Sequence, residues 1–331
     1  MIISKAPLRL GIAGGGTDIE EFINIEGGLV LNSTINLFAY SFIEKSDEDT
    51  FISIDYSESG SSKDLGFSSK KYLQYAYQVK MFVDKNLTLK PEKLKISTYS
   101  EVPHGSGLGS SSALVVSLLE GLRRFYSLSL TKYELAEYAF HIERKIMNQS
   151  GGKQDQYSAV FGGVNYIEFN KESTIVNPLK IDSKFLNTLE SSMVSFFQGQ
   201  SRDSGKIIND QKINIKDKID GFKKIKKDAS KIKNAFINND MTELNKLLNI
   251  AWEHKKATSS LIANNRILDL FDNIKSRGAS SAKISGAGGG GFALIFCPPY
   301  LKHGLVNYLK TQGEVYNINF YNKGVISWKV K

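Results

Sequence analysis

Three glycine-rich segments of the 331-residue chain combine residue types that bind anions. They are residues 13–18 (AGGGTD), 104–113 (HGSGLGSSSA) and 285–292 (SGAGGGGF). The middle segment follows a strand-like stretch and precedes the apolar run LVVSLLEGL. A helix that starts there offers free backbone N–H groups and a partial positive charge, glycines allow close approach, and serine hydroxyls add donors. This order predicts a phosphate-binding loop, although the loop alone also fits a serine-capped helix with a flexible lead-in.

None of the three segments matches a standard nucleotide-binding motif. A Walker A loop requires a lysine after its last glycine, and no segment has one. The third segment fits GxGxxG at Gly286, Gly288 and Gly291, but it leads into FALIF, which reads as a strand. A dinucleotide-binding loop opens a helix, so a Rossmann site is excluded.

Ionisable residues stand at the edges of these loops. Arg9 lies in the first strand-like stretch, and Asp18 closes the first glycine segment. Glu143 lies beside the apolar stripe of its helix, where a carboxylate is costly unless it is paired or bound to a metal. Its two basic neighbours point elsewhere on an α-helix. Asp155, in GGKQDQY, either faces a cleft or is an exposed residue at a helix start.

The elements that must position these residues are mixed. Residues 1–60 have mainly strand character, and a half-buried strand at 94–98 runs into the middle glycine segment. Helical spacing follows it, and a second helix begins at Thr131, where Glu134 completes a capping box. Strands and helices alternate loosely in both halves, which predicts an α+β fold. A polar stretch suggests a boundary near residue 170, with domains at 1–170 and 171–331.

Bulk composition narrows the function classes. Hydrophobic residues make up 41% of the chain, and no window has the roughly 20 continuous apolar residues of a membrane span. The N-terminus lacks the pattern of a signal peptide. The single Cys297 cannot form an internal disulfide, so a reducing cytoplasm is the simplest compartment. Four histidines and one cysteine show no metal-ligand spacing.

The chain carries a net charge of +9, and much of the excess lies in residues 206–233. Isoleucine and phenylalanine recur there at helical spacing with lysines between them, which predicts an amphipathic helix with a solvated lysine face. No aromatic residues are interleaved for base stacking, so nucleic-acid binding is disfavoured. A small phosphorylated substrate is compatible with a basic surface.

The stretch from Pro103 to Ala113 resembles the P-x-x-x-G-L-G-S-S-x-A loop of the GHMP kinases, the superfamily of galactokinase, homoserine kinase, mevalonate kinase and phosphomevalonate kinase. The other two glycine segments resemble the first and third motifs of that family, and the resemblance covers essentially the whole chain. APLRLGIAGGGTD and GGKQDQYSAVFGGVN are most similar to the bacterial D-glycero-D-manno-heptose 7-phosphate kinases and also resemble the kinase half of fucokinases. Galactokinases have G-E-H where this chain has Gly14–Gly16, which makes galactose an unsuitable substrate.

The resemblance implies a fold with an N-terminal domain like ribosomal protein S5 domain 2 and a ferredoxin-like C-terminal domain, with the active site between them. It implies an enzyme that uses ATP and Mg²⁺ to phosphorylate a small sugar phosphate. For the heptose kinases the acceptor is the anomeric C1 hydroxyl, and the product is a 1,7-bisphosphate used for nucleotide-activated heptose. The alternative is a fucokinase-like sugar 1-kinase with an unphosphorylated substrate. The oligomeric state is open, and a homodimer is compatible with the sequence.

The resemblance also implies roles for single residues. Asp155 matches the proposed catalytic base and Arg9 its basic partner, while Ser111 and Glu143 match the positions that hold Mg²⁺. The ATP phosphates would be wrapped by residues of the middle segment: Pro103, Gly105, Ser106, Gly107, Leu108, Gly109, Ser110, Ser111 and Ser112.

The sugar site would draw on the first segment, where Asp18 would accept hydrogen bonds from sugar hydroxyls. It would also draw on the third segment, where Gly286–Gly291 would close the site and side chains would collide with substrate or phosphate. Its residues would be Gly14, Gly15, Gly16, Thr17, Asp18, Ser285, Gly286, Gly288 and Gly289. Lys153 and Arg202 are the cations expected to hold the phosphate of the substrate, unless they are surface ion-pair partners.

Overall fold

A computed structural model describes residues 1–54, 58–61, 71–103, 105–199 and 204–330. Two of the residues singled out by the sequence, His104 and Arg202, lie outside this described part. Among the described residues, no helix combines the length and the apolar character needed to cross a bilayer.

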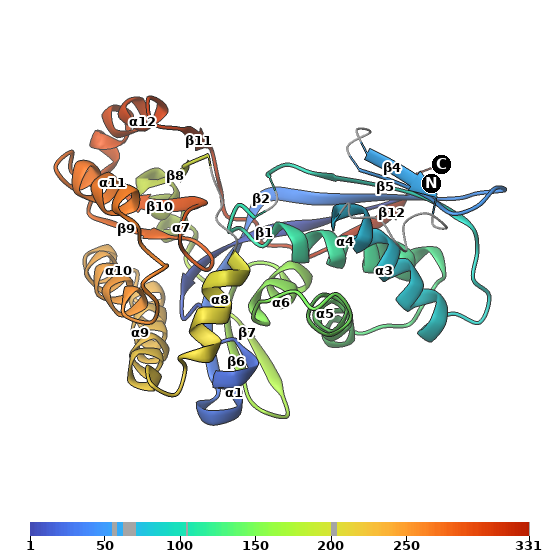
Figure 1. Cartoon of the computed structure of the whole chain (residues 1–331). Coiled ribbons are helices and arrows are strands. Elements are labelled where there is room, and N and C mark those ends of the chain that lie inside the picture. Colours follow the sequence, from blue (N-terminus) through green and yellow to red (C-terminus); the bar gives the residue numbers. More distant parts are fainter. Residues whose placement is uncertain (55–57, 62–70, 104, 200–203, 331) are drawn as a thin grey trace.

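The larger layer is an eight-stranded sheet with strand order β12-β1-β2-β5-β3-β4, in which β6 pairs with β2 and β7 pairs with β6. Its strands are β1 (Ile2–Ala13), β2 (Gly28–Lys45), β3 (Phe51–Ile54), β4 (Glu58–Ser61), β5 (Leu94–Ser100), β6 (Val164–Phe169), β7 (Thr174–Pro178) and β12 (Ile326–Lys329). Helices lie along one face of this sheet (Figure 1): α3 (Lys71–Asn86), α4 (Ser110–Phe125), α5 (Lys132–His141) and α6 (Gln154–Phe161). The short helix α1 (Glu20–Glu26) links β1 to β2.

Helix α4 lies at the centre of this half because it is apolar on nearly all sides. Every residue from Ala113 to Leu122 is buried, and the helix packs against β1 and β2. A helix without a polar face is stable only when it is covered all round. Its burial fixes the position of its N-terminus, which is where the middle glycine segment ends.

The second layer is a four-stranded antiparallel sheet with order β11-β8-β10-β9. It consists of β8 (Met193–Phe197), β9 (Ser281–Ile284), β10 (Phe292–Phe296) and β11 (Glu314–Tyr316). Strands β8 and β10 are buried along their whole length, which explains their continuous apolar sequences. The helices of this half are α7 (Ser183–Ser192), α8 (Ser204–Ile213), α9 (Ile219–Ile237), α10 (Met241–Lys256), α11 (Asn265–Lys275), the 3₁₀ turn η2 (Pro299–Leu301) and α12 (Lys302–Lys310).

The structure confirms the α+β class but corrects one element. The lysine-rich segment 206–233 is not one helix, because α8 ends at Ile213 and α9 begins at Ile219. Ile215 is buried in the intervening turn, where it packs with Phe22 and Phe222. The apolar spacing that predicted a single helix therefore spans a break.

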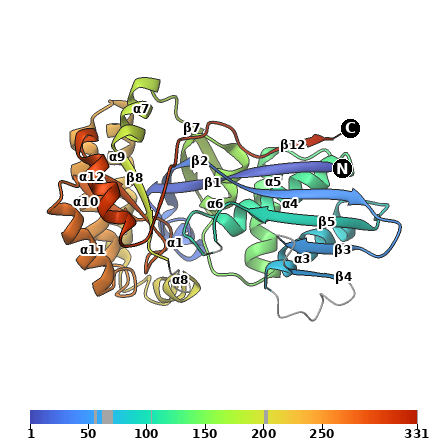
Figure 2. The same cartoon turned by 90° about the horizontal axis from the view of Figure 1, so that it is seen from above.

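The end of the chain returns to the first sheet. Strand β12 pairs with β1, and an isolated bridge joins Ile35 to Phe320. Both termini lie at the same end of the molecule (Figure 2). Strands β7 and β12 follow residue 170 in sequence, so the first sheet draws strands from both sides of the expected boundary. The division at residue 170 remains a prediction.

Candidate active site

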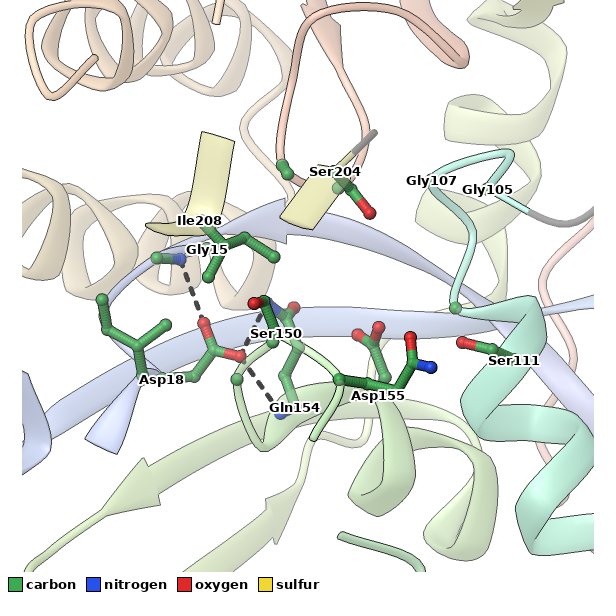
Figure 3. Close-up of a pocket in the computed structure, with 18 of the residues that line it drawn as sticks. Gly15, Asp18, Gly105, Gly107, Ser111, Ser150, Gln154, Asp155, Ser204 and Ile208 are labelled. Carbon is green, nitrogen blue, oxygen red and sulfur yellow. Dashed lines mark hydrogen bonds between the residues drawn. The ribbon is translucent and has the colours of Figure 1, made fainter. Parts of the chain in front are cut away.

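A cavity of about 390 Å³ contains residues from both halves of the chain. Figure 3 shows Asp155 between Gly15 and Asp18 on one side and Gly105, Gly107 and Ser111 on the other. The lining residues are Arg9, Gly15, Gly16, Asp18, Ile19, Tyr75, Gly105, Gly107, Gly109, Ser110, Ser111, Arg144, Gln149, Ser150, Gly151, Gly152, Gln154, Asp155, Ser204, Ile208, Gln211, Lys255, Gly286 and Ala287.

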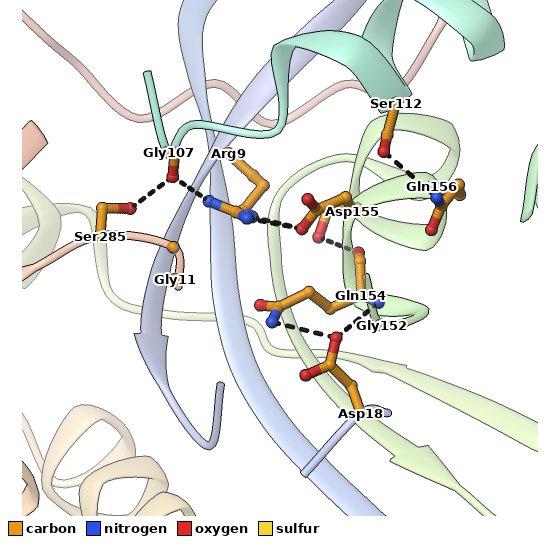
Figure 4. Close-up of polar contacts among 12 residues, drawn as sticks. Arg9, Gly11, Asp18, Gly107, Ser112, Gly152, Gln154, Asp155, Gln156 and Ser285 are labelled. Carbon is orange, nitrogen blue, oxygen red and sulfur yellow. Dashed lines mark hydrogen bonds and ion pairs between the residues drawn. The ribbon is translucent and has the colours of Figure 1, made fainter. Parts of the chain in front are cut away.

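Arg9 and Asp155, which both line this cavity, form an ion pair (Figure 4). The Nε and Nη2 atoms of Arg9 lie 2.7 and 2.6 Å from Oδ1 of Asp155. The Nη1 atom donates to the carbonyl of Gly107 at 2.6 Å, and the backbone N–H of Arg9 donates to the carbonyl of Leu108. The guanidinium, which is almost fully buried, therefore fixes the carboxylate and the glycine loop at once.

The loop delivers the N-terminus of α4 to this pair. Gly109 is the N-cap residue and has φ of +75°, a left-handed conformation that favours glycine. A glycine has no side chain to cap the first N–H groups of the helix, and Ser110 and Ser111 of this first turn line the cavity. This geometry argues against the simple serine-capped helix and for an anion-binding turn.

Four of the expected phosphate-loop residues do not line the cavity. Pro103 is exposed, and the side chain of Leu108 is buried in the hydrophobic core. Ser106 is buried, and the hydroxyl of Ser112 accepts from Nε2 of Gln156 at 3.1 Å. These residues anchor the loop, whereas Gly105, Gly107, Gly109, Ser110 and Ser111 form its cavity face.

The third glycine segment packs directly on the middle one. A Cβ atom on Gly286 would lie 2.9 Å from the Cα of Gly107, and one on Gly107 would lie 2.6 Å from the carbonyl oxygen of Ser285. A Cβ on Gly291 would lie 2.5 Å from the carbonyl oxygen of Ser106. These glycines were expected to leave room for substrate or phosphate. In the structure they leave room for the backbone of the other loop.

The remaining third-segment residues support the same contact from outside the cavity. The hydroxyl of Ser285 donates to the carbonyl of Gly107 at 3.1 Å. A Cβ on Gly288 would lie 2.9 Å from the side chain of Ile262, and the N–H of Gly289 donates to the carbonyl of Ile262. Ser285, Gly288 and Gly289 do not line the cavity, so only Gly286 of the expected set does.

Asp18 forms a buried acidic wall of the cavity. Its Oδ1 accepts from the N–H of Gly16 at 3.0 Å, and its Oδ2 accepts from the N–H and Nε2 of Gln154 at 3.2 and 3.1 Å. Burial raises the pKa of this carboxyl, and the charge of Asp155 raises it further. Gln154, which sequence reasoning missed, therefore orients the acid that the sequence identified.

Gly14 and Thr17 shape the first loop without lining the cavity. The hydroxyl of Thr17 accepts from the N–H of Leu29 at 3.0 Å, and Gly14 packs against the backbone of β2 at the same point. The first loop is thus attached to the sheet, and Gly15 and Gly16 form its cavity face.

Glu143 lies fully buried in the π-turn η1 (Ile142–Ile146) and outside the cavity lining. Its Oε2 accepts from Nε2 of Gln156, and its Oε1 has no hydrogen-bond partner. Nη1 of Arg144 lies 3.6 Å from Oε1 of Glu143, which corrects the expectation that both basic neighbours point away from this carboxylate. The wider turn of a π-helix changes the angle between consecutive side chains.

Lys153, one of the two cations expected for the substrate phosphate, does not line the cavity. Nζ of Lys153 lies 3.1 Å from Oε1 of Glu137 and 4.8 Å from the ring centre of Phe140. This placement supports the surface ion-pair alternative for Lys153. Arg202 lies outside the described residues.

Sequence reasoning also missed Arg144, Lys255 and the α8 residues Ser204, Ile208 and Gln211. Lys255 had a detectable signal, because it continues the buried stripe of Leu244, Leu248 and Trp252 at helical spacing. In the sequence, Lys255 stands in the run HKK (residues 254–256), which is typical of a solvated basic surface. The sequence contains no such signal for Arg144, because the direction of its side chain depends on the π-turn.

The site joins the N-terminus of a helix and its glycine loop to an arginine–aspartate pair and a second buried carboxylate. Such a site binds a phosphorylated donor beside a hydroxyl acceptor, which defines a small-molecule kinase. The chain matches the GHMP kinases N terminal domain over residues 72–163 and the GHMP kinases C terminal domain over residues 232–314. It belongs to the GHMP kinase family and is an ATP-dependent sugar kinase.

Two relatives match along their whole length. A D-glycero-alpha-D-manno-heptose 7-phosphate kinase of Campylobacter jejuni is 37% identical over 99% of both chains. The crystal structure of a D-glycero-D-manno-heptose 1-phosphate kinase from Bacteroides thetaiotaomicron is 36% identical, covers 100% of both chains and superposes with a TM-score of 0.82. An L-fucokinase/L-fucose-1-P guanylyltransferase of Bacteroides fragilis is 24% identical over 88% of this chain, which spans 34% of that larger protein.

Proposed function

We propose that the protein transfers the γ-phosphoryl group of ATP to the anomeric C1 hydroxyl of D-glycero-D-manno-heptose 7-phosphate and forms the 1,7-bisphosphate. The observation that carries this proposal is the meeting of the α4 N-terminus, the Arg9–Asp155 pair and Asp18 in one cavity. Full-length similarity to heptose phosphate kinases supports the sugar. Their names differ in the phosphate position, 7 in one and 1 in the other, so the assay must identify the substrate phosphate and the product.

The N–H groups at the start of α4 and the backbone of Gly105, Gly107 and Gly109 hold the ATP phosphates. The C1 hydroxyl oxygen forms a bond to the γ-phosphorus, the bond to the bridging oxygen breaks, and its electron pair leaves with ADP. The hydroxyl proton passes to the carboxylate of Asp155, which Arg9 holds through two contacts. Arg9 also stabilises negative charge on the transferred group.

Mg²⁺ fits two residues of this site. The hydroxyl of Ser111 lines the cavity, and Glu143 has a buried carboxylate oxygen without a hydrogen-bond partner. The described residues contain no cluster of three His, Cys, Asp or Glu side chains that could hold a metal. Mg²⁺ commonly uses one or two protein ligands together with substrate phosphates, so Ser111 and Glu143 would hold the ion without such a cluster. The ion would neutralise charge on the ATP phosphates.

Asp18 accepts hydrogen bonds from sugar hydroxyls, because the N–H groups that hold it orient its oxygens at the cavity wall. Of the described cations that line the cavity, we assign Arg144 to the phosphate of the substrate. Its Nη1 lies 3.6 Å from Oε1 of Glu143, the carboxylate oxygen that has no hydrogen-bond partner. Arg202 remains a second candidate from the sequence.

A fucokinase-like activity on an unphosphorylated sugar is the second candidate, and the similarity to the Bacteroides fragilis enzyme favours it. The two functions differ in whether the cavity must bind a phosphate of the sugar. A sugar without a phosphate needs no cation beyond those that serve ATP, so Arg144 would be dispensable for it.

A coupled assay of ADP release with heptose 7-phosphate, heptose 1-phosphate, heptose, fucose, mannose and galactose tests the proposal. We expect turnover with heptose 7-phosphate, and phosphorus NMR should locate the new phosphate on C1. Asp155→Asn should lower kcat by about 10²-fold or more while ATP binding persists. Preference for fucose or free heptose would transfer the assignment to the second candidate, and undiminished turnover by Asp155→Asn would refute the mechanism.

A further inference from the structure

Among the described residues, Lys255 is the one cavity cation from the helices of the C-terminal half. It lies in the last turn of α10 and is 7% exposed. Its aliphatic stem continues the buried face of the helix, and its ammonium reaches the cavity. Lysine is almost never this buried unless its charge has a partner.

The hydrogen bonds of this ammonium are incomplete. It donates to the carbonyl of Gly286, which is its one hydrogen-bond partner among the described residues. A protonated lysine has three N–H donors. Two of these donors have no partner in the described part of the chain and are available to a ligand in the cavity that Lys255 lines.

The position of the ammonium is defined by both glycine loops. Gly286, its acceptor, packs against Gly107 of the phosphate loop. A Cβ on Gly15, in the first loop, would lie 4.0 Å from its Nζ. Lys255 therefore lies where the loop for ATP phosphates meets the loop for the sugar.

The charges around Lys255 favour the binding of an anion. Burial and the nearby Arg9 lower the pKa of Lys255 to about 8, and Asp18 opposes this only in part. Two buried cations in one small cavity repel each other, which costs free energy unless a negative group enters between them. A phosphoryl group with its oxygens between Arg9 and Lys255 would remove that cost.

We propose that Lys255 is a catalytic residue that contacts the γ-phosphoryl group of ATP as it is transferred, so that the C-terminal half supplies a charge that the phosphate loop lacks. This inference rests on the proposed kinase reaction. It adds a second fixed cation to Arg9 at the transferred group. The same ammonium chemistry would suit the phosphate of the sugar, and the experiment separates the two sources.

The test compares AMP-PNP with ADP, each with Mg²⁺, by calorimetry on the full chain. Lys255→Met should weaken AMP-PNP binding by about tenfold or more and leave ADP binding within about twofold, because only AMP-PNP has a γ-phosphoryl group. In turnover assays kcat should fall about 10²-fold, with a nearly constant KM for the sugar phosphate. Lys255→Arg, which keeps the charge, should recover part of both losses.

Lys283→Met is the matched control. Lys283 is also a lysine near Arg9. It donates to the carbonyls of Gly11 and Ile12 at 2.7 and 2.6 Å and does not line the cavity. The ratio of AMP-PNP to ADP affinity should stay at the wild-type value in this variant. The comparison separates the loss of a lysine charge near Arg9, in Lys283→Met, from the loss of the contact with the γ-phosphoryl group, in Lys255→Met.

Equal weakening of AMP-PNP and ADP in Lys255→Met, or a rise confined to the KM of the sugar phosphate, would overturn the inference. Should Lys255→Met fail to fold by circular dichroism, Lys255→Gln, which can still donate to Gly286, carries the same comparison. The nucleotide measurement needs no sugar. A wild-type enzyme that binds AMP-PNP but ignores heptose 7-phosphate would therefore refute the proposed substrate and leave the test of Lys255 intact.

Discussion

Buried charges of both signs meet in the cavity, and each acts on the others. Arg9 is paired with Asp155, while Asp18 and Lys255 are held mainly by backbone groups and Gln154. Burial raises the pKa of Asp18 and lowers that of Lys255, so burial disfavours the charged form of each. Such opposing shifts are typical of sites that bind charged substrates.

The pH dependence of activity should report Lys255. The ammonium is the active form, and its pKa is lowered to about 8, so kcat/KM should be flat below pH 8 and fall about tenfold per unit above it. The charged groups that face it are Arg9, Asp18 and Lys283. In Lys255→Arg the alkaline limb should move beyond pH 10, since arginine stays protonated. A limb at pH 8 that survives in this variant would assign it to another group.

At the scale of elements, the phosphate loop is held by its neighbours on two sides. Strand β1 contacts it through Arg9, and the β9–β10 turn contacts it through Ser285, Gly286 and the N–H of Phe292, which donates to the carbonyl of Ser106 at 3.0 Å. A glycine-rich loop has high conformational entropy when free. These contacts preorganise it before ATP binds.

Gly286→Ala tests this docking. Gly286 has φ of +79°, and its Cβ would lie 2.9 Å from the Cα of Gly107, so the substitution both strains the turn and separates the loops. We expect a loss of about 1–3 kcal/mol in the free energy of unfolding and a weaker affinity for ATP. Chemical denaturation and calorimetry measure the two effects.

Gly304→Ala is the control, because this glycine lies in α12 with nothing within 4 Å of its Cβ position. It should leave ATP affinity unchanged and stabilise the fold by about 0.5–1 kcal/mol. A Gly286→Ala enzyme with wild-type stability and ATP affinity would contradict the docking role of the third segment.

At the scale of the whole molecule, the chain closes on itself. After the second sheet, the N–H of Tyr321 donates to the carbonyl of Thr34, the N–H of Val325 donates to that of Ala159, and β12 covers the edge of β1. Figure 2 shows this return path from the C-terminal half to the N-terminal strand. The segment therefore supports β1, which carries Arg9, and the end of α6, whose first turn carries Asp155.

A chain that ends at Asn317 should show the importance of this closure. It loses the hydrogen bonds of Tyr321 and Val325 and exposes the edge of β1. We expect the thermal midpoint to fall by about 5–10 °C and kcat to fall with it. A chain that ends at Val330 keeps β12 and should match the full-length protein. Equal stability of the two truncations would show that the return segment does not support the site.

Features that depend on neighbouring residues could be predicted from the sequence. The capping box of Thr131 and Glu134 is present, because its residues lie three positions apart. The glycine–serine loop leads into an apolar helix as predicted, because loop and helix are adjacent in the sequence. The segment FALIF forms the predicted strand. The motifs in their order also identified the family.

The tertiary structure alone decided which of these residues face the cavity. Gly107 and Ser285 touch across 178 positions, and Lys255 reaches Gly286 across 31, distances at which local spacing carries no information. For that reason the sequence assigned the third glycines to the substrate instead of to the phosphate loop, and placed Lys153 at the site although Glu137 holds it elsewhere. The sequence thus determined the chemistry available to this kinase, and the packing of its two sheets decided which charges meet, because burial and pairing exist only in the folded chain.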